Sequence, residues 1–300
     1  MMKSTWEFND FDRDSEFNYC FEKNGFAIIQ NFASDKECDE LRDEMKKIVN
    51  EMKMDDHPKS IFTTKNQEKH LSDKYFIDSV DKISFFFEEG AFNNKGELVV
   101  DKFTSLNKVG HALHVKNDKF KNFTFSDKVK VICKTINLQN PTIVQSMYIF
   151  KNPKIGGVVT EHVDSSYLHT NDGEKLIGFW IALEDVTFQN GCLDFYPSSN
   201  NDIKVTYRFE RDLSDPNEKL IHRGVKPEFG KECYTYAPVK KGSLIIIHGD
   251  VVHKSKQNES DTSRNVYAFH VVDRNKNLQW PKTNWLQETD NYKFYGIYDH

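Results

Sequence analysis

The first 140 residues carry apolar positions in two patterns, one typical of strands and one of helices. Gly25 to Ile29 is a short apolar run, as in a buried strand. Ser34 followed by Glu37 is the pattern of a capping box and predicts that a helix begins there. Apolar residues then recur at helical spacing, at Leu41, Met45, Ile48 and Met52.

Two more elements are predicted before residue 141. The apolar run from Ile83 to Phe87 indicates a strand, and residues 93–96 indicate a turn between short strands. A second helix is expected from Phe120 to Leu138, because its apolar residues fall on one face, at Val129, Ile132, Cys133 and Ile136.

After Pro141 the pattern changes to short apolar segments separated by turn residues such as Gly156-Gly157 and Asn190-Gly191. Many short strands with such punctuation are typical of a sandwich or barrel, and we expect a jelly roll. Strands are predicted at Thr142–Phe150, Val158–Leu168, Leu176–Leu183, Cys192–Tyr196, Ser243–Ile247, Val251–Ser255 and Asn265–Val272.

These patterns predict a mainly β fold with flanking helices (α+β), in a single domain over residues 1–300. Residues 12–140 would form a helical and short-strand support. Residues 141–275 would form the core that carries the chemistry, and residues 276–300 a C-terminal extension.

Composition and charge exclude several classes of partner. Phenylalanine accounts for 24 of 300 residues, which is ample material for a large core. The net charge is −5 and no basic stripe is present, so we expect no nucleic acid partner. The longest aliphatic run, Leu244 to Ile247, is far too short to span a bilayer, and we expect no membrane partner.

The cysteines indicate the compartment. The five residues are scattered and form no CxxC pair, at Cys20, Cys38, Cys133, Cys192 and Cys233. This is typical of reduced thiols in an intracellular protein rather than of a disulfide framework. Because the first residues also lack the apolar region of a signal peptide, we expect a cytoplasmic location.

Two histidines and one aspartate form the candidate metal site. In a strand, alternate side chains share a face, so His162 and Asp164 would point the same way. His253 follows a strongly apolar run and would supply a third ligand. Two imidazoles and a carboxylate are the facial triad of a non-haem Fe(II) that keeps positions open for reactants. The alternative is a surface-strand pair with ordinary hydrogen bonds, and for His253 a half-buried histidine.

A second His-x-Asp sequence shows how weak that dipeptide is by itself. His248-Gly249-Asp250 lacks a histidine and an arginine at suitable distances downstream, and its glycine marks a turn. We therefore reject it as a metal site.

Arg264 is the candidate anchor for a bound diacid. It follows His253 closely enough to lie on the next strand, and a guanidinium can fork onto the far carboxylate of a ligand chelated to the metal. Ser255, two residues after His253, would donate a hydroxyl to the same carboxylate. The alternatives are a surface arginine paired with Asp261 or Asp273, and a plain turn serine.

Several longer segments resemble the phytanoyl-CoA dioxygenase family, and the resemblance covers most of the chain. They begin with Phe21-Glu22-Lys23-Asn24-Gly25-Phe26-Ala27-Ile28-Ile29 and continue at residues 81–88, 107–114, 144–151 and 248–258. Together they are similar to a branch of the family other than its peroxisomal hydroxylase.

The resemblance implies a double-stranded β-helix (jelly roll, cupin-like) core with Fe(II) on His162, Asp164 and His253. It also implies contacts with the cosubstrate 2-oxoglutarate from five side chains, at Lys108, Met147, Trp180, Ser255 and Arg264. Without the resemblance, Lys108 would be a solvated loop lysine, and Met147 and Trp180 would be core residues.

The sequence thus predicts an Fe(II)- and 2-oxoglutarate-dependent dioxygenase. It would couple oxidative decarboxylation of 2-oxoglutarate to hydroxylation of a small molecule, possibly lipid or acyl-CoA like, with dioxygen as co-reactant and ascorbate as a helpful reductant. Two alternatives stay open. One is a cupin-like zinc or manganese isomerase or hydrolase, and the other is a non-catalytic 2-oxoglutarate sensor. The sequence does not indicate the oligomeric state.

Overall fold

The computed structural model describes residues 2–62, 74–170, 175–215, 219–229, 234–275 and 278–300. The strands are β1 Thr5–Glu7, β2 Phe26–Gln30, β3 Ile83–Phe87, β4 Leu106–His111, β5 Pro141–Ile149, β6 Val159–His162, β7 Leu176–Ala182, β8 Leu193–Phe195, β9 Arg208–Arg211, β10 Leu220–Arg223, β11 Thr235–Ala237, β12 Leu244–His248, β13 His253–Ser255, β14 Val266–Asp273 and β15 Tyr295–Gly296.

The α-helices are α1 Phe17–Asn24, α2 Asp35–Glu51, α3 Lys74–Ile77, α4 Leu113–Lys116, α5 Asp118–Thr124, α6 Asp127–Thr135 and α7 Ser199–Asp202. Short 3-10 helices lie at Phe11–Arg13, Met54–Asp56, Asp164–Ser166 and Ile297–Asp299.

Two sheets face each other and form the double-stranded β-helix. In the described residues the large sheet has the strand order β1-β2-β12-β7-β14-β5-β4-β3, with β15 beside β5. The small sheet has the order β11-β8-β13-β6. Apolar side chains from both sheets share one cluster, in which the rings of Phe26 and Phe195 stack with centroids 4.2 Å apart. The mainly β fold with a double-stranded β-helix core is therefore confirmed.

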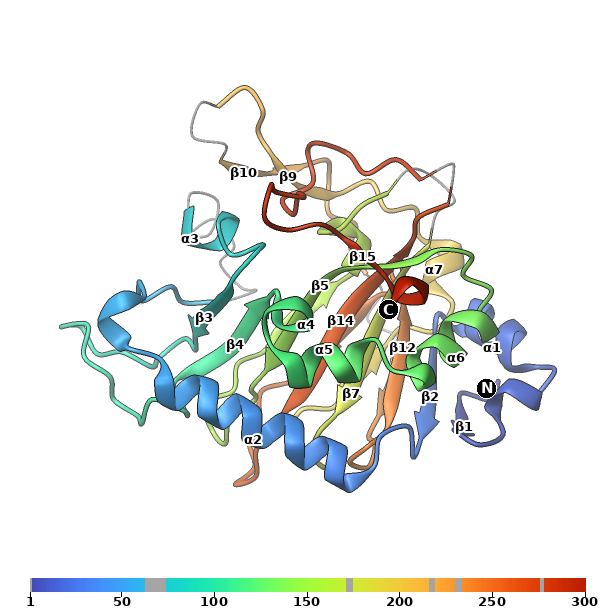
Figure 1. Ribbon diagram of the computed structural model, residues 1–300, viewed down its shortest axis with the longest axis horizontal. Coiled ribbons are helices and arrows are strands. Elements are labelled where there is room, and N and C mark those ends of the chain that lie inside the picture. Colours follow the sequence, from blue (N-terminus) through green and yellow to red (C-terminus); the bar gives the residue numbers. More distant parts are fainter. Residues whose placement is uncertain (1, 63–73, 171–174, 216–218, 230–233, 276–277) are drawn as a thin grey trace.

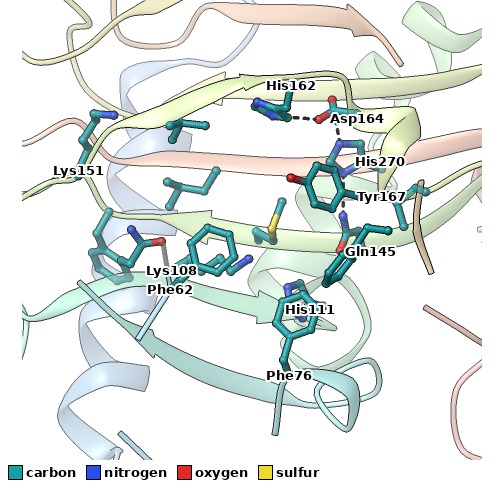
Figure 2. A pocket seen from close by; sticks show the side chains of 18 of the residues that line it. Phe62, Phe76, Lys108, His111, Gln145, Lys151, His162, Asp164, Tyr167 and His270 are labelled. Carbon is teal, nitrogen blue, oxygen red and sulfur yellow. Dashed lines mark hydrogen bonds and ion pairs between the residues drawn. The ribbon is translucent and has the colours of Figure 1, made fainter. Parts of the chain in front are cut away.

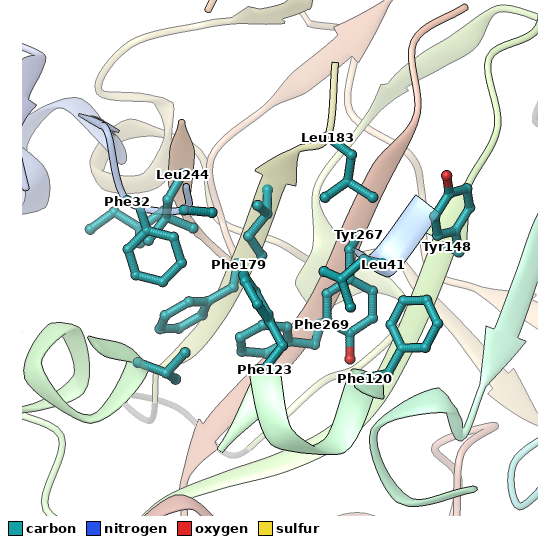
Figure 3. Close-up of a cluster of buried hydrophobic side chains, with 14 of the residues drawn as sticks. Phe32, Leu41, Phe120, Phe123, Tyr148, Phe179, Leu183, Leu244, Tyr267 and Phe269 are labelled. Atoms are coloured by element: carbon teal, nitrogen blue, oxygen red, sulfur yellow. The ribbon is translucent and has the colours of Figure 1, made fainter. Parts of the chain in front are cut away.

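Helices cover the outer face of the large sheet. Figure 1 shows α2, α4, α5 and α6 lying across one side of the sheet. Between them lies an aromatic cluster, in which Phe120 and Phe123 of α5 contact Tyr267 of β14 (Figure 3). This packing buries the outer face of the sheet and leaves its inner face for the site.

The alternation along β14 separates the two faces. Tyr267, Phe269 and Val271 belong to the outer cluster, whereas Val266 and Ala268 belong to the cluster between the sheets. Because side chains alternate along a strand, the residues of even number point toward the small sheet. Their small size leaves room there for functional groups.

Most predicted elements are present, and two differ. Ser34 caps α2 through the expected capping box with Glu37. The predicted helix from Phe120 to Leu138 is two helices, because Ser126 adopts an extended backbone and its hydroxyl donates to the Phe123 carbonyl. The predicted strand from Val158 to Leu168 ends at His162, where the chain turns toward a 3-10 helix.

The segments before residue 141 do more than support the core. Strands β1, β2, β3 and β4 extend the large sheet at both edges. The sequence patterns missed β9, β10 and β11, whose few apolar residues give no clear alternation. Within the described segments no helix combines the length and the apolar character needed to cross a membrane.

The described cysteines are buried and free, at Cys20, Cys38, Cys133 and Cys192. Cys233 lies outside the described residues.

Candidate metal centre

The three predicted ligands meet between strands β6 and β13 of the small sheet. His162 and His253 are direct partners in the antiparallel pairing of these strands. Nε2 of His162 lies 3.6 Å, and Nε2 of His253 3.7 Å, from Oδ1 of Asp164. The three potential ligand atoms lie within 4.8 Å of one another, which suits a shared metal ion.

Backbone carbonyls fix the tautomers of both histidines. Nδ1 of His162 lies 2.8 Å from the Thr160 carbonyl oxygen, and Nδ1 of His253 lies 3.0 Å from that of Val251. A carbonyl oxygen only accepts, so Nδ1 carries the proton in each ring and Nε2 keeps its lone pair. Burial, with repulsion from His162, lowers the pKa of His253 to about 4, so this ring is neutral at neutral pH. The donor set therefore fits a divalent metal.

Asp164 reaches the site from the 3-10 helix rather than from a strand. His270 Nε2 lies 3.2 Å from Asp164 Oδ2, and the Gln145 amide lies 3.2 Å from the other ring nitrogen of His270. Burial opposes ionisation of Asp164, but the surrounding imidazoles, His270 among them through a hydrogen bond, hold its pKa well below the usual range. The carboxylate is thus ionised, and His270, which is not a candidate ligand, orients it.

Glycine at position 178 of β7 makes room for this contact. A Cβ atom there would lie 3.3 Å from Asp164 Oδ2 and 3.7 Å from His270 Nε2. Sequence reasoning missed His270, Gln145 and Gly178. Extending the alternation of Arg264, Val266 and Ala268 by two residues would have placed His270 on the same face.

Arg264 lies at the same cavity and is almost completely buried. The alternative of a surface arginine is therefore wrong. Its two suggested partners are engaged elsewhere: Asp261 pairs with Lys154, and Asp273 accepts from the backbone of residues 139 and 140. The Nε and Nη1 atoms of Arg264 have no hydrogen-bond partner among the described residues. Burial lowers its pKa to about 10, so the guanidinium stays charged at neutral pH. A buried charge of this kind is costly unless an anion pairs with it.

Trp180 and Ser255 do not line the cavity themselves but contact residues that do. The guanidinium carbon of Arg264 lies 5.2 Å from the ring centroid of Trp180, which also packs between the two sheets. Ser255 is buried and accepts a hydrogen bond from Lys151 Nζ at 2.7 Å, so it is not an exposed turn serine. Sequence reasoning did not single out Lys151.

Lys108 is a strand residue of β4 and not a solvated loop lysine. Its ammonium nitrogen lies 3.5 Å from the ring centroid of Phe62 and within 5.4 Å of those of Phe76 and Phe86. Burial lowers its pKa to about 7. Lys108 and Met147 both line the cavity that contains Asp164.

This cavity has a volume of about 190 Å³ and joins most of the predicted residues. Figure 2 shows Lys151 at one end and Asp164, His270 and Gln145 at the other. Five of the predicted residues line it directly, namely Lys108, Met147, His162, Asp164 and Arg264. Aromatic and aliphatic side chains form much of the remaining wall, including Phe62, Phe76, Leu168, Phe209 and Trp285.

The rejected His-x-Asp sequence lies elsewhere. Asp250 follows β12 in a turn, where it accepts from the Ser165 hydroxyl, and its backbone N–H donates to His248. In the part of the chain that the structure describes, the one cluster able to hold a metal is formed by His162, Asp164 and His253.

Sequence similarity places the chain among known proteins. The model of the phytanoyl-CoA dioxygenase family matches residues 21–266. The phytanoyl-CoA dioxygenase domain-containing protein 1 homolog of Caenorhabditis elegans is 48% identical over 93% of this chain and 97% of its own. The protein of that name from Danio rerio is 44% identical over 93% of this chain and 96% of its own.

Solved structures share the fold at low sequence identity. The non-heme alpha-ketoglutarate-dependent carbocyclase SnoK of nogalamycin biosynthesis superposes with a TM-score of 0.60 at 16% identity, covering 94% of this chain and 96% of its own. EctD from S. alaskensis with bound Fe superposes with a TM-score of 0.62 at 14% identity, covering 94% and 85%. The family match and the identity to its named relatives confirm the resemblance seen in the sequence: the chain belongs to the phytanoyl-CoA dioxygenase family of non-haem iron, 2-oxoglutarate-dependent oxygenases.

Proposed function

We propose that the protein is an Fe(II)- and 2-oxoglutarate-dependent dioxygenase that hydroxylates a small molecule. The overall reaction would convert 2-oxoglutarate, dioxygen and substrate into succinate, carbon dioxide and hydroxylated substrate. One observation carries the proposal: one cavity is lined by His162 and Asp164 of the metal-ligand triad and by the buried guanidinium of Arg264, two of whose nitrogen atoms have no hydrogen-bond partner among the described residues. Family membership and the iron and alpha-ketoglutarate named for matched structures support it.

His162, Asp164 and His253 would hold the iron. Bound there, Fe(II) would leave positions open for 2-oxoglutarate and dioxygen and supply the oxidising chemistry. The chain contributes the neutral imidazoles and the ionised carboxylate, each oriented by a second group.

Arg264 and Ser255 would hold the far carboxylate of 2-oxoglutarate. A guanidinium presents two parallel N–H groups to a carboxylate, which fixes orientation as well as adding affinity. Trp180 would keep the guanidinium plane in place from behind. Lys108 and Met147, which line the cavity, would contact the cosubstrate from the side of β4 and β5.

The substrate would carry a substantial apolar part. Phe76, Leu168, Phe209 and Trp285 supply an apolar wall that excludes water from the reacting atoms. Gln145 Oε1 is buried there without a partner among the described residues, so a substrate donor group would satisfy it. A lipid or acyl-CoA-like molecule fits this wall, and the relatives' name points the same way.

The proposal also covers domain organisation, cellular location and partners. We infer one domain in which residues 141–275 carry the metal site, with residues 12–140 and 276–300 supporting it, and a cytoplasmic location. Dioxygen and a small molecule would be its partners.

The experiment that tests the function is succinate production by the purified protein with Fe(II), ascorbate, 2-oxoglutarate and dioxygen. The Asp164→Ala variant sets the background. Succinate above that background is expected and would permit a screen for substrates that stimulate turnover.

An absence of succinate would be followed by calorimetry with 2-oxoglutarate and Mn(II). Binding without turnover under every substrate tried would favour the sensor. No binding would overturn the proposal and favour the zinc or manganese isomerase or hydrolase.

A further inference from the structure

Lys151, just beyond the end of β5, is a buried lysine beside the predicted anchor of the cosubstrate. Burial and repulsion from Arg264 lower its pKa well below the usual range. Its side chain is 2% exposed, and it lines the same cavity as Arg264. Its side-chain nitrogen donates to Ser255 Oγ at 2.7 Å. Glu88 attracts it, but among the described residues no carboxylate forms a salt bridge with it. A lysine is rarely buried without an anionic partner, because removing its charge from water is costly.

The surroundings of Lys151 are shaped for its side chain. A Cβ at Gly156 would lie 2.7 Å from Lys151 Cγ, and a Cβ at Gly191 would lie 2.6 Å from its Cε. Both distances are shorter than a carbon–carbon contact allows, so two glycines form the channel through which the stem passes. The Lys151 carbonyl also accepts from the Arg264 backbone N–H at 3.1 Å, so the backbones of the two residues lie side by side.

The balance of charge around Lys151 favours an anion. Arg264 adds a buried guanidinium, and Glu88 is the buried carboxyl group that attracts both side chains. Burial raises the pKa of Glu88 to about 7, against hydrogen bonds from Asn107 and the Gly157 N–H, so this group is only partly ionised at neutral pH. Lys151 and Arg264 thus share one partly ionised carboxyl group, and Glu184 attracts Arg264 as well. An anion bound beside them would favour the charged form of Lys151.

The hydrogen bond to Ser255 has a direct consequence for the hydroxyl. Lys151 occupies an acceptor position of the Ser255 oxygen, so the Ser255 proton is left to point to another acceptor. A carboxylate held by Arg264 would be that acceptor.

We propose that Lys151 is a positioning and specificity-determining residue of the cosubstrate site. It fixes the Ser255 hydroxyl as a donor and, together with Arg264, selects a ligand that carries a distal carboxylate. This inference rests on the proposed function, because the ligand concerned is 2-oxoglutarate.

The test compares two ligands that differ only in the distal carboxylate. Binding of 2-oxoglutarate and of 2-oxopentanoate is measured by calorimetry with Mn(II) in place of Fe(II), for the wild type and for Lys151→Met. The variant is expected to lose about ten- to a hundredfold in affinity for 2-oxoglutarate, the range for a lost charge-assisted hydrogen bond. Its affinity for 2-oxopentanoate should stay as it is in the wild type.

Two further variants make the test specific. Lys154→Met removes an exposed lysine of the same loop, which pairs with Asp261, and should leave both affinities unchanged. Lys151→Gln, which retains a donor for Ser255 without a charge, should bind 2-oxoglutarate with an affinity between those of the wild type and Lys151→Met. Thermal unfolding checks that each variant is folded. Lys151→Met should unfold at no lower temperature than the wild type, because it removes a buried ionisable group that is costly to take out of water.

The outcomes separate the two proposals. A parallel loss for both ligands, or no loss for either, would overturn the role of Lys151 while leaving the proposed function intact. If Lys151→Met does not fold, the same comparison with Lys151→Gln decides. If the wild type itself does not bind 2-oxoglutarate with Mn(II), the proposed function fails and this inference fails with it.

Discussion

The two ends of the cavity satisfy their polar groups in different ways. At the metal end, Nδ1 of His162 and of His253 contacts a backbone carbonyl, and His270 lies between Asp164 and Gln145. At the other end, Arg264 keeps two buried nitrogen atoms for which the described residues offer no acceptor.

This difference corresponds to two kinds of recognition. A metal ion requires ligands whose tautomer and orientation are set before it arrives, so the chain supplies every supporting contact itself. A carboxylate is bound by donors that the chain does not use internally, because a donor already paired gains little from a ligand. The comparison predicts that variants at the metal end alter metal affinity, whereas variants at the other end alter 2-oxoglutarate affinity alone.

The largest effect is expected from Asp164→Ala. Removing the carboxylate leaves two imidazoles to hold the ion, so metal binding and succinate formation should both fall to background. Titration with Fe(II) or Mn(II) measures the first and the succinate assay the second. Asp250→Ala, the same substitution in the rejected His-x-Asp sequence, should retain both, and equal losses in the two variants would contradict the assignment.

Arg264→Met should produce the next largest effect. Losing a desolvated charged contact costs on the order of 2–5 kcal/mol, so the KM for 2-oxoglutarate should rise by about 30-fold or more. Metal affinity should stay at the wild-type value. An unchanged KM would move the anchor elsewhere, and a matching loss of metal affinity would remove the distinction between the two ends.

His270→Ala tests whether an indirect contact matters at the metal end. Groups that orient a metal ligand typically contribute about 10- to 100-fold to metal affinity, and a loss of this size is expected in a metal titration. The affinity for 2-oxoglutarate, measured at saturating metal, should change much less. A variant that binds metal normally would show that Asp164 needs no support from His270.

Sequence patterns reached the metal end more fully than the other end. The three candidate ligands come from a His-x-Asp motif and a histidine after an apolar run. At the other end, the alternation before β14 indicated only that Arg264 faces inward. The predicted strand through Asp164 was wrong, since the chain turns after His162, yet the carboxylate still meets both imidazoles. Short local patterns were sufficient there because His162 and Asp164 are close in sequence.

The other end depends on contacts between distant segments. Glu88 follows β3 and Lys151 follows β5, and only the strand order brings them to one cavity. A glutamate and a lysine near turns are usually solvated, and nothing local marks these two as buried. The glycines at 156 and 191 looked like turn residues, and their role beside Lys151 depends on the packed structure.

The smallest effect concerns pH and Glu88. Its pKa of about 7 lies above the usual 4.5, so raising the pH from 6 to 8 ionises it within the folded protein. The new negative charge faces Lys151 and Arg264 and opposes a second carboxylate, so 2-oxoglutarate affinity should weaken severalfold over this range. In Glu88→Gln this position stays neutral, and the decline should be smaller. The remainder would come from Lys108, which lines the same cavity and whose pKa burial lowers to about 7. Calorimetry at several pH values measures both slopes. Equal changes of affinity with pH in the two proteins would show that the charge of Glu88 does not affect 2-oxoglutarate binding.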